Sequence, residues 1–144
     1  MFLHTYFHSL DAKGRLIIPS KYRDDIGKSQ VVVTRGWDAN LVVYTMEAWK
    51  TYTQSWLDLP GSDPKVRKYR RFVATNAEQC ELDKQGRILI SQELRDHANL
   101  TKDVVISGNL TSFELWNPER WKEVSDFGDD ETISAEIGEL NARI

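Results

Sequence analysis

The stretch S-L-D-A-K-G-R-L-I-I, residues 9–18, returns 72 positions later as E-L-D-K-Q-G-R-I-L-I, residues 81–90. The match runs without a gap from residues 9–50 to residues 81–122, and 13 of these 42 positions are identical. A gapless internal repeat indicates one structural unit that is present twice in the chain. Each unit alone is close to the lower size limit for a stable core. We therefore expect the two copies to pack on each other or on other subunits.

Turn residues and hydrophobic periodicity predict the same order of elements in both copies. Asp11 to Gly14 is typical of a tight turn, because Asp bonds its own backbone two residues on and Gly accepts a positive φ. We expect a β-hairpin around this turn, followed by a short helix at 20–25, a strand pair at 31–34 and 41–44, and a helix at 46–57. The second copy repeats this plan, with a turn at Asp83 to Gly86, strands at 87–90, 103–107 and 112–116, and helices at 91–97 and from 117 onward.

The predicted elements divide the chain into repeat one at 1–50, a helical connector at 51–76, repeat two at 77–122 and an acidic tail at 123–144. In the connector, Asp63 is the expected N-cap and Pro64 the first residue of a helix at about 64–76. The tail is weakly periodic at Ile133, Ile137 and Leu140. This pattern leaves open whether the tail is a docking helix or a frayed end.

Composition narrows the class of protein. Residues 1–75 contain 12 Lys and Arg against 7 Asp and Glu, a net charge of +5, whereas residues 76–144 have a net charge of −8. A basic half is compatible with a nucleic-acid partner, although the acidic tail could equally serve only solubility. The single cysteine, Cys80, excludes an intrachain disulfide framework, and neither a signal peptide nor a membrane-spanning stretch is predicted. We expect a soluble cytoplasmic protein.

The pattern Asp-x-x-x-Arg, at Asp11/Arg15 and Asp83/Arg87, is the strongest candidate for a functional site. The aspartates have a structural interpretation, as turn residues that pair with an arginine across the hairpin or a subunit boundary. The arginines could instead donate to phosphates or to the major-groove edge of guanine. We expect a cluster of cations around the first turn and its following helix, formed by Lys13, Arg15, Lys21 and Arg23. Only two of the four counterparts in the second copy are cationic, Arg87 and Arg95, so the first copy is predicted to be the better phosphate binder.

The chain resembles a known protein family. The doubled unit, the initial M-F, the A-x-x-C-E-L-D stretch at 77–83 and F-E-L-W at 113–116 are similar to the MraZ family of bacterial transcriptional regulators. The resemblance covers about residues 1–122 and leaves the tail outside. It implies a mainly β fold with flanking helices (α+β), in which two SpoVT/AbrB-type units interleave as a pseudo-two-fold, swapped-hairpin, double-ψ-like β-barrel. It also implies a ring of subunits, an octamer or larger.

The resemblance further implies double-stranded DNA as the partner, with short direct repeats in the promoter ahead of the division and cell-wall gene cluster as the target. It implicates Arg15 in DNA contact, and we extend this expectation to Lys13, Lys21, Arg23 and Arg87, with Asp11, Gly14, Asp83 and Gly86 as signature turn residues. We expect nucleoid association, and repression is the working expectation for the direction of regulation, which the sequence leaves open. The alternative function is a structural or interaction ring that recruits a protein partner.

The remaining patterns are weaker. The helix at 65–72 has five cations in seven residues, which suit either a solvated brace between the copies or a second phosphate-tracking surface. His4 and His8 on a strand would lie roughly 13 Å apart, too far for a shared metal. No coherent catalytic set and no phosphate-binding Gly loop are present. We therefore expect no enzyme activity, no metal, no cofactor and no small-molecule substrate.

Overall fold

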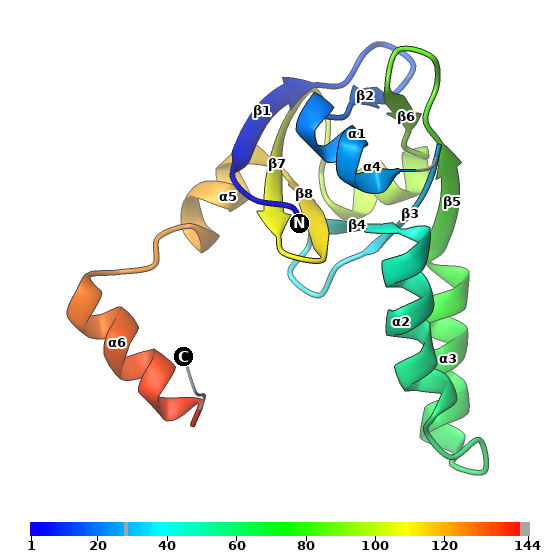
Figure 1. Cartoon of the computed structure of the whole chain (residues 1–144), viewed down its shortest axis with the longest axis vertical. Helices are drawn as coiled ribbons and strands as arrows, with labels where there is room; N and C mark the ends of the chain where they lie inside the picture. Colours follow the sequence, from blue (N-terminus) through cyan, green and yellow to red (C-terminus); the bar gives the residue numbers. More distant parts are fainter. Residues whose placement is uncertain (28, 142–144) are drawn as a thin grey trace.

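The computed structural model describes residues 1–27 and 29–141. Within them the chain forms eight strands and six helices, which confirms the predicted α+β class (Figure 1). The strands are β1 (Thr5–Ser9), β2 (Arg15–Ile17), β3 (Gln30–Arg35), β4 (Leu41–Thr45), β5 (Ala77–Glu81), β6 (Arg87–Leu89), β7 (Asp103–Asn109) and β8 (Ser112–Trp116). The helices are α1 (Ser20–Ile26), α2 (Met46–Leu57), α3 (Pro64–Thr75), α4 (Gln92–His97), α5 (Pro118–Val124) and α6 (Asp130–Glu139).

The two copies of the repeat exchange strands. Six strands form one sheet in the order β1-β7-β8-β4-β3-β5, and β2 and β6 form a second, two-stranded sheet. The first strand of each copy is paired with the third strand of the other, so Thr5 lies opposite Ser107 and Ala77 lies opposite Thr34. β2 and β6 also join the copies, and all of these pairs are antiparallel. The copies therefore share both sheets and do not form separate domains.

This exchange corrects the hairpin predicted around the first turn. The turn itself is present, because the Asp11 N–H donates to the Arg15 carbonyl at 2.9 Å and the Gly14 N–H donates to the Asp11 carbonyl at 3.0 Å. The strands on its two sides, however, pair with β7 and β6 and belong to different sheets. The turn at Asp83 behaves in the same way. Local sequence specifies a turn, whereas the choice of partner strand depends on burial across the whole fold.

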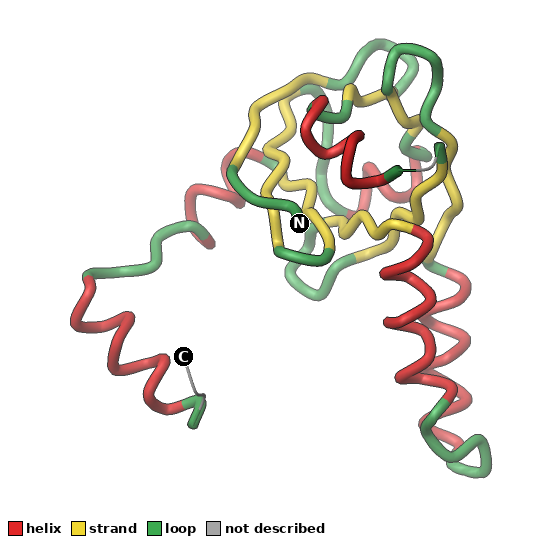
Figure 2. Tube along the Cα trace, in the orientation of Figure 1, coloured by secondary structure: helices red, strands yellow, loops and turns green. Residues whose placement is uncertain are grey.

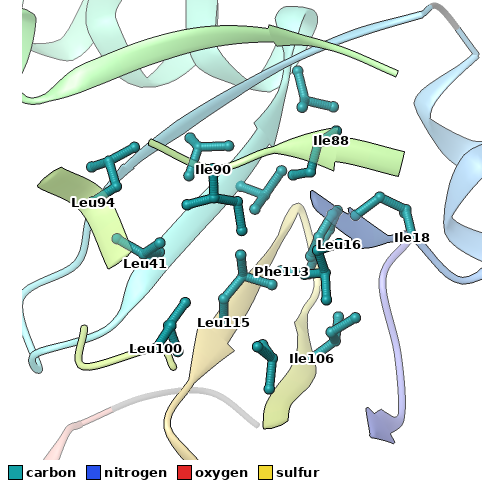
Figure 3. Packing of buried hydrophobic residues seen from close by; sticks show 14 of the residues in the cluster. Leu16, Ile18, Leu41, Ile88, Ile90, Leu94, Leu100, Ile106, Phe113 and Leu115 are labelled. Carbon is teal, nitrogen blue, oxygen red and sulfur yellow. The ribbon is translucent and has the colours of Figure 1, made fainter. Parts of the chain in front are cut away.

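The core lies between the two sheets and takes residues from both copies (Figure 3). Leu16 and Ile88 are opposite each other in the β2–β6 pair, and both are fully buried. Their chain neighbours Ile17 and Leu89 point outward and are exposed, as the two-residue period of a strand requires. Burying a Leu or Ile side chain stabilises a fold by roughly 1.5–3 kcal/mol. This central layer therefore ties the two copies together.

Helices α2 and α3 lie side by side and project from the sheet as a two-helix arm (Figures 1 and 2). The predicted cap of α3 is confirmed, because the Asp63 side chain accepts from the Lys65 N–H at 2.8 Å and Pro64 is the first residue. Arg70 of α3 donates to three carbonyls at the end of α2, those of Trp56, Leu57 and Leu59, at 2.9–3.1 Å. A cation at this end also interacts favourably with the helix dipole.

Arg67 supports the same arm from the loop side. Its Nη1 donates to the carbonyls of Gly61 and Ser62, both at 3.0 Å. Two of the five cations in the basic helix thus hold α3 against the loop that joins it to α2. These contacts favour a bracing role for α3 over a phosphate-binding surface in which all five cations are free.

The C-terminal part forms two helices, α5 and α6, and is not a frayed end over these residues. Helix α5 contacts β7, and the rings of Trp116 and Trp121 lie 5.8 Å apart. Helix α6 begins after its N-cap Asp129 and has no buried residue. Figure 1 shows α6 held away from the sheets on the chain that follows α5. In the part of the chain that the structure describes, no helix is both long and apolar enough to cross a membrane.

Candidate functional site

The two Asp-x-x-x-Arg turns have the same internal hydrogen bonds. The Asp11 carboxylate accepts from the N–H groups of Lys13 and Arg15, both at 2.9 Å, and from Arg15 Nε at 2.7 Å. The Asp83 carboxylate accepts from the N–H groups of Gln85 and Arg87, both at 2.9 Å, and from Arg87 Nε at 2.8 Å. The aspartates therefore have the structural role considered above, and they also orient the arginines.

These hydrogen bonds keep both carboxylates ionised. The Arg15 backbone N–H is the largest cause of the low pKa of Asp11, about 2 against an ordinary value of 3.8. The Arg87 backbone N–H lowers the pKa of Asp83 in the same way. Each aspartate therefore carries a full negative charge at neutral pH and compensates the charge of one arginine. The remaining positive charge of the turns comes from the exposed Lys13 and Lys84.

Each arginine is held through Nε, and its terminal nitrogens have fewer partners. Within the described residues, Arg15 makes no side-chain hydrogen bond other than that with Asp11, and its side chain is 31% exposed. Arg87 is 24% exposed, and its Nη1 lies 3.6 Å from Asp11 Oδ2. The structure therefore brings Arg15, Arg87 and the two aspartates together at one end of the fold, where both turns lie (Figure 1).

Gly14 and Gly86 are required in these turns for two reasons. Their φ angles are +83° and +77°, a region that residues with a side chain rarely adopt. In addition, a Cβ on Gly14 would lie 2.7 Å from the guanidinium carbon of Arg95, and one on Gly86 would lie 2.2 Å from Nη1 of Arg23. The arginine that follows each copy's turn thus covers the glycine of the other copy.

This crossing changes the expected surroundings of Arg23. Instead of gathering with Lys13 and Arg15 at its own turn, Arg23 lies against the second copy's turn, where its Nη1 is 3.5 Å from the Gln85 carbonyl oxygen. Arg95, which was not among the predicted site residues, occupies the equivalent position over Gly14, and its Nε donates to the Ile90 carbonyl at 3.0 Å. Both residues are identical in the sequence repeat, and that identity was the signal for a shared role.

The last predicted cation, Lys21, is exposed on α1, and its side chain has no hydrogen bond or ion pair with another described residue. Within residues 1–27 and 29–141, no group of three or more His, Cys, Asp or Glu side chains is arranged to hold a metal ion. The chemistry of the site is therefore that of paired guanidinium groups, oriented by carboxylates and flanked by lysines.

Two interleaved copies of one β-rich unit, each with an Asp-x-x-x-Arg turn at the same end, define a class of tandem-repeat α+β proteins. The model of one family, described as "MraZ protein, putative antitoxin-like", matches residues 1–72 and again residues 73–136. The chain belongs to the MraZ family.

Similar chains cover most or all of its length. A protein of Lachnoclostridium phytofermentans is 47% identical over 122 residues, 85% of each chain. One of Thermoanaerobacter sp. is 42% identical and covers 98% of this chain and 99% of its own. One of Desulfitobacterium hafniense is 38% identical over the full length of both. All three are named transcriptional regulator MraZ, and a transcriptional regulator is a non-enzymatic kind of protein.

Proposed function

We propose that this chain is a DNA-binding transcriptional regulator and that the end of the fold with the two turns contacts the duplex. The observation that carries the proposal is the pair of Asp-oriented arginines, Arg15 and Arg87, at that end. A guanidinium fixed through Nε still offers its terminal nitrogens, which can donate in parallel to phosphate or guanine. The names of the relatives support the same role.

Charge at this end favours a polyanion. The turns at 11–15 and 83–87 contain four cations and two aspartates, and Arg23 and Arg95 lie over them. This leaves an excess of four positive charges among these residues, although the whole chain has a net charge of −3. A local excess of this kind steers a polyanion independently of the total charge. We place Lys13, Arg15, Lys21, Arg23 and Arg87 at the interface.

We further propose that the interleaved copies form a swapped-hairpin β-barrel of the AbrB type and that subunits assemble into a ring. The exchange of β1 and β5 between the copies supports the barrel. Nonspecific phosphate contact alone gives dissociation constants of roughly 10⁻⁴–10⁻⁶ M. Neighbouring subunits on successive direct repeats can raise avidity by about 10²–10⁴. The targets would be repeats upstream of the division and cell-wall genes, read by a cytoplasmic, nucleoid-associated repressor.

An Arg15→Ala variant tests this proposal. We expect it to lose at least tenfold in affinity for DNA from the region upstream of its own gene, measured by gel shift, while light scattering shows an unchanged oligomer. Arg15→Lys keeps the positive charge but loses the parallel N–H donors of the guanidinium, and we expect it to bind DNA with intermediate affinity. Arg120→Ala is the matched control, because Arg120 lies in α5 and pairs with Glu123. Binding by Arg15→Ala that equals this control would contradict the role of Arg15.

Salt dependence separates a DNA-binding ring from an interaction ring. Counterion release makes the logarithm of the DNA affinity fall steeply with the logarithm of the salt concentration. We expect a steep slope for the unaltered chain and a shallower slope for a Lys13→Ala variant, since one phosphate contact is lost. A flat slope for the unaltered chain would favour the interaction ring.

A further inference from the structure

Helix α6 has an apolar stripe that the described part of its own chain leaves uncovered. Ile133, Ile137 and Leu140 follow one another at spacings of four and three residues, which places them on one side of the helix. Ile137 is 37% exposed and Leu140 is 70% exposed, and α6 buries no residue. A helix of ten residues is marginal in water without tertiary contacts. Its stability therefore calls for an apolar surface elsewhere.

An apolar groove of matching character lies between α2 and α3. Its volume is about 450 Å³. Trp49 and Trp56 of α2 line one wall, Val73 and Ala74 of α3 line the other, and Val32 of β3 contributes from the sheet. Two tryptophans at the edge of an unfilled groove provide a large contact area for aliphatic side chains.

The borders of the groove are basic. Lys50 follows the lining residue Met46 by four positions and precedes Thr53 by three, so it flanks the α2 wall. Arg71 precedes the lining residue Ala74 by three positions and flanks the α3 wall. Both cations are exposed, and neither has a salt bridge to another described residue.

The borders of the apolar stripe on α6 are acidic. Asp130 precedes Ile133 by three positions, and Glu136 follows it by three, so one carboxylate lies on each side of the stripe. Helix α6 thus combines an apolar centre with acidic borders, and the α2–α3 groove combines an apolar centre with basic borders. The two surfaces are complementary in both hydrophobicity and charge.

We infer that α6 of one subunit binds in the α2–α3 groove of a second copy of this chain. The groove in the same chain is a poor match, because α5 contacts β7, whereas the groove opens beside β3 and β5 at the far edge of the sheet. In Figure 1, α6 lies at the lower left and the two-helix arm at the lower right. The inference does not rest on DNA binding.

A disulfide trap tests the contact directly. Two chains, both with Cys80→Ala to remove the native thiol, are expressed together, one with Ile137→Cys and the other, which has a size tag, with Thr53→Cys in the groove. We expect the mixed disulfide in at least tenfold higher yield than with Ala135→Cys, which places the thiol on the opposite side of α6. A yield no greater than this control overturns the inference. So does a chain with both Ile137→Cys and Thr53→Cys whose disulfide closes within one molecule at every dilution.

Reversing the charges on both surfaces provides a second test of the contact, and this test needs no DNA. Asp130→Lys with Glu136→Lys on the Ile137→Cys chain should lower the yield of the mixed disulfide severalfold at low salt. Lys50→Glu with Arg71→Glu on the Thr53→Cys chain should then restore it. No loss in the first variant, or no recovery in the combination, would show that these charges do not meet. Because the experiment measures only the trapped dimer, its result is independent of the proposed DNA contact.

Discussion

Arg87 Nη1 lies 3.6 Å from Asp11 Oδ2, so an arginine of the second copy reaches the aspartate of the first. Asp11 also binds Arg15, whose Nε is 2.7 Å from the same oxygen. Asp83, by contrast, has a salt bridge with Arg87 alone among the described residues. The two turns share the Asp-x-x-Gly-Arg pattern and their internal hydrogen bonds, but Asp11 is the one that links the copies electrostatically.

Asp11→Asn is therefore expected to lower the melting temperature at pH 7 by more than Asp83→Asn does. The folded-state pKa of Asp11 is about 2, below its ordinary value of 3.8, so the stability it contributes is complete above about pH 4 and is lost as the pH falls toward 2. Thermal unfolding followed by circular dichroism should show the variant and the unaltered chain converging in this range. Equal effects of the two substitutions at pH 7 would contradict the special position of Asp11.

Gly14→Ala is expected to cost roughly 1–2 kcal/mol from its positive φ alone, and more where the new methyl group displaces Arg95. Gly27→Ala is the matched control, because Gly27 also has a positive φ of 66° but no atom within 4 Å of the added Cβ. Urea unfolding at one fixed protein concentration measures both. In an Arg95→Ala background the difference between the two glycines should disappear. A difference that persists there would show that Arg95 is not its cause.

Arg70→Ala should loosen the two-helix arm, because three carbonyls at the end of α2 would lose their donor. Chymotrypsin reports this well, since Leu57 is exposed in the segment that Arg70 holds and the substitution removes no chymotrypsin site. We expect cleavage there to become severalfold faster. Arg71→Ala controls for the lost charge, because no described residue accepts a hydrogen bond from the Arg71 side chain. Similar rates for the two variants would argue against the brace.

Glu114 should make the fold less stable as the pH rises above its ordinary pKa of 4.5. Burial raises the pKa of this carboxyl, despite hydrogen bonds donated by Trp116 Nε1 and Asn40 Nδ2. A raised pKa means that the folded state keeps a proton that the unfolded state has released, so stability falls from about pH 4.5 upward. Glu114→Gln should flatten this part of a plot of melting temperature against pH. An unchanged slope would exclude Glu114 as its source.

Sequence reasoning was most successful where the signal is local. The Asp11–Gly14 turn, the Asp63 cap with Pro64, and the helix that begins after Asn117 were all predicted from a few adjacent residues, and the structure confirms them. Each depends on hydrogen bonds between a side chain and a backbone only two to four residues away. The α+β class was implied by the resemblance to the MraZ family, and the predicted strands and helices agree with it.

The partners of those elements were harder to predict. The strands around the Asp11 turn were expected to pair with each other, but they pair with strands of the second copy. The alternation of apolar residues shows which face of a strand is buried, but it does not show which strand lies next to it. Arg23 was expected beside Arg15 and instead covers Gly86. The identity of Arg23 and Arg95 in the repeat indicated a shared role, but only the crossing of the copies reveals which glycine each one meets.

The exchange of β1 has a consequence for synthesis on the ribosome. Thr5 is paired with Ser107, which is added 102 residues later. At about 5–20 residues per second, the strand at the N-terminus waits roughly 5–20 s for its partner to be made. During that interval the N-terminal half lacks the strands of the second copy with which it forms β-sheet hydrogen bonds. Its apolar residues Leu16 and Ile18 also lack the residues of the second copy that bury them. Folding to the native state must therefore be a late, nearly post-translational event.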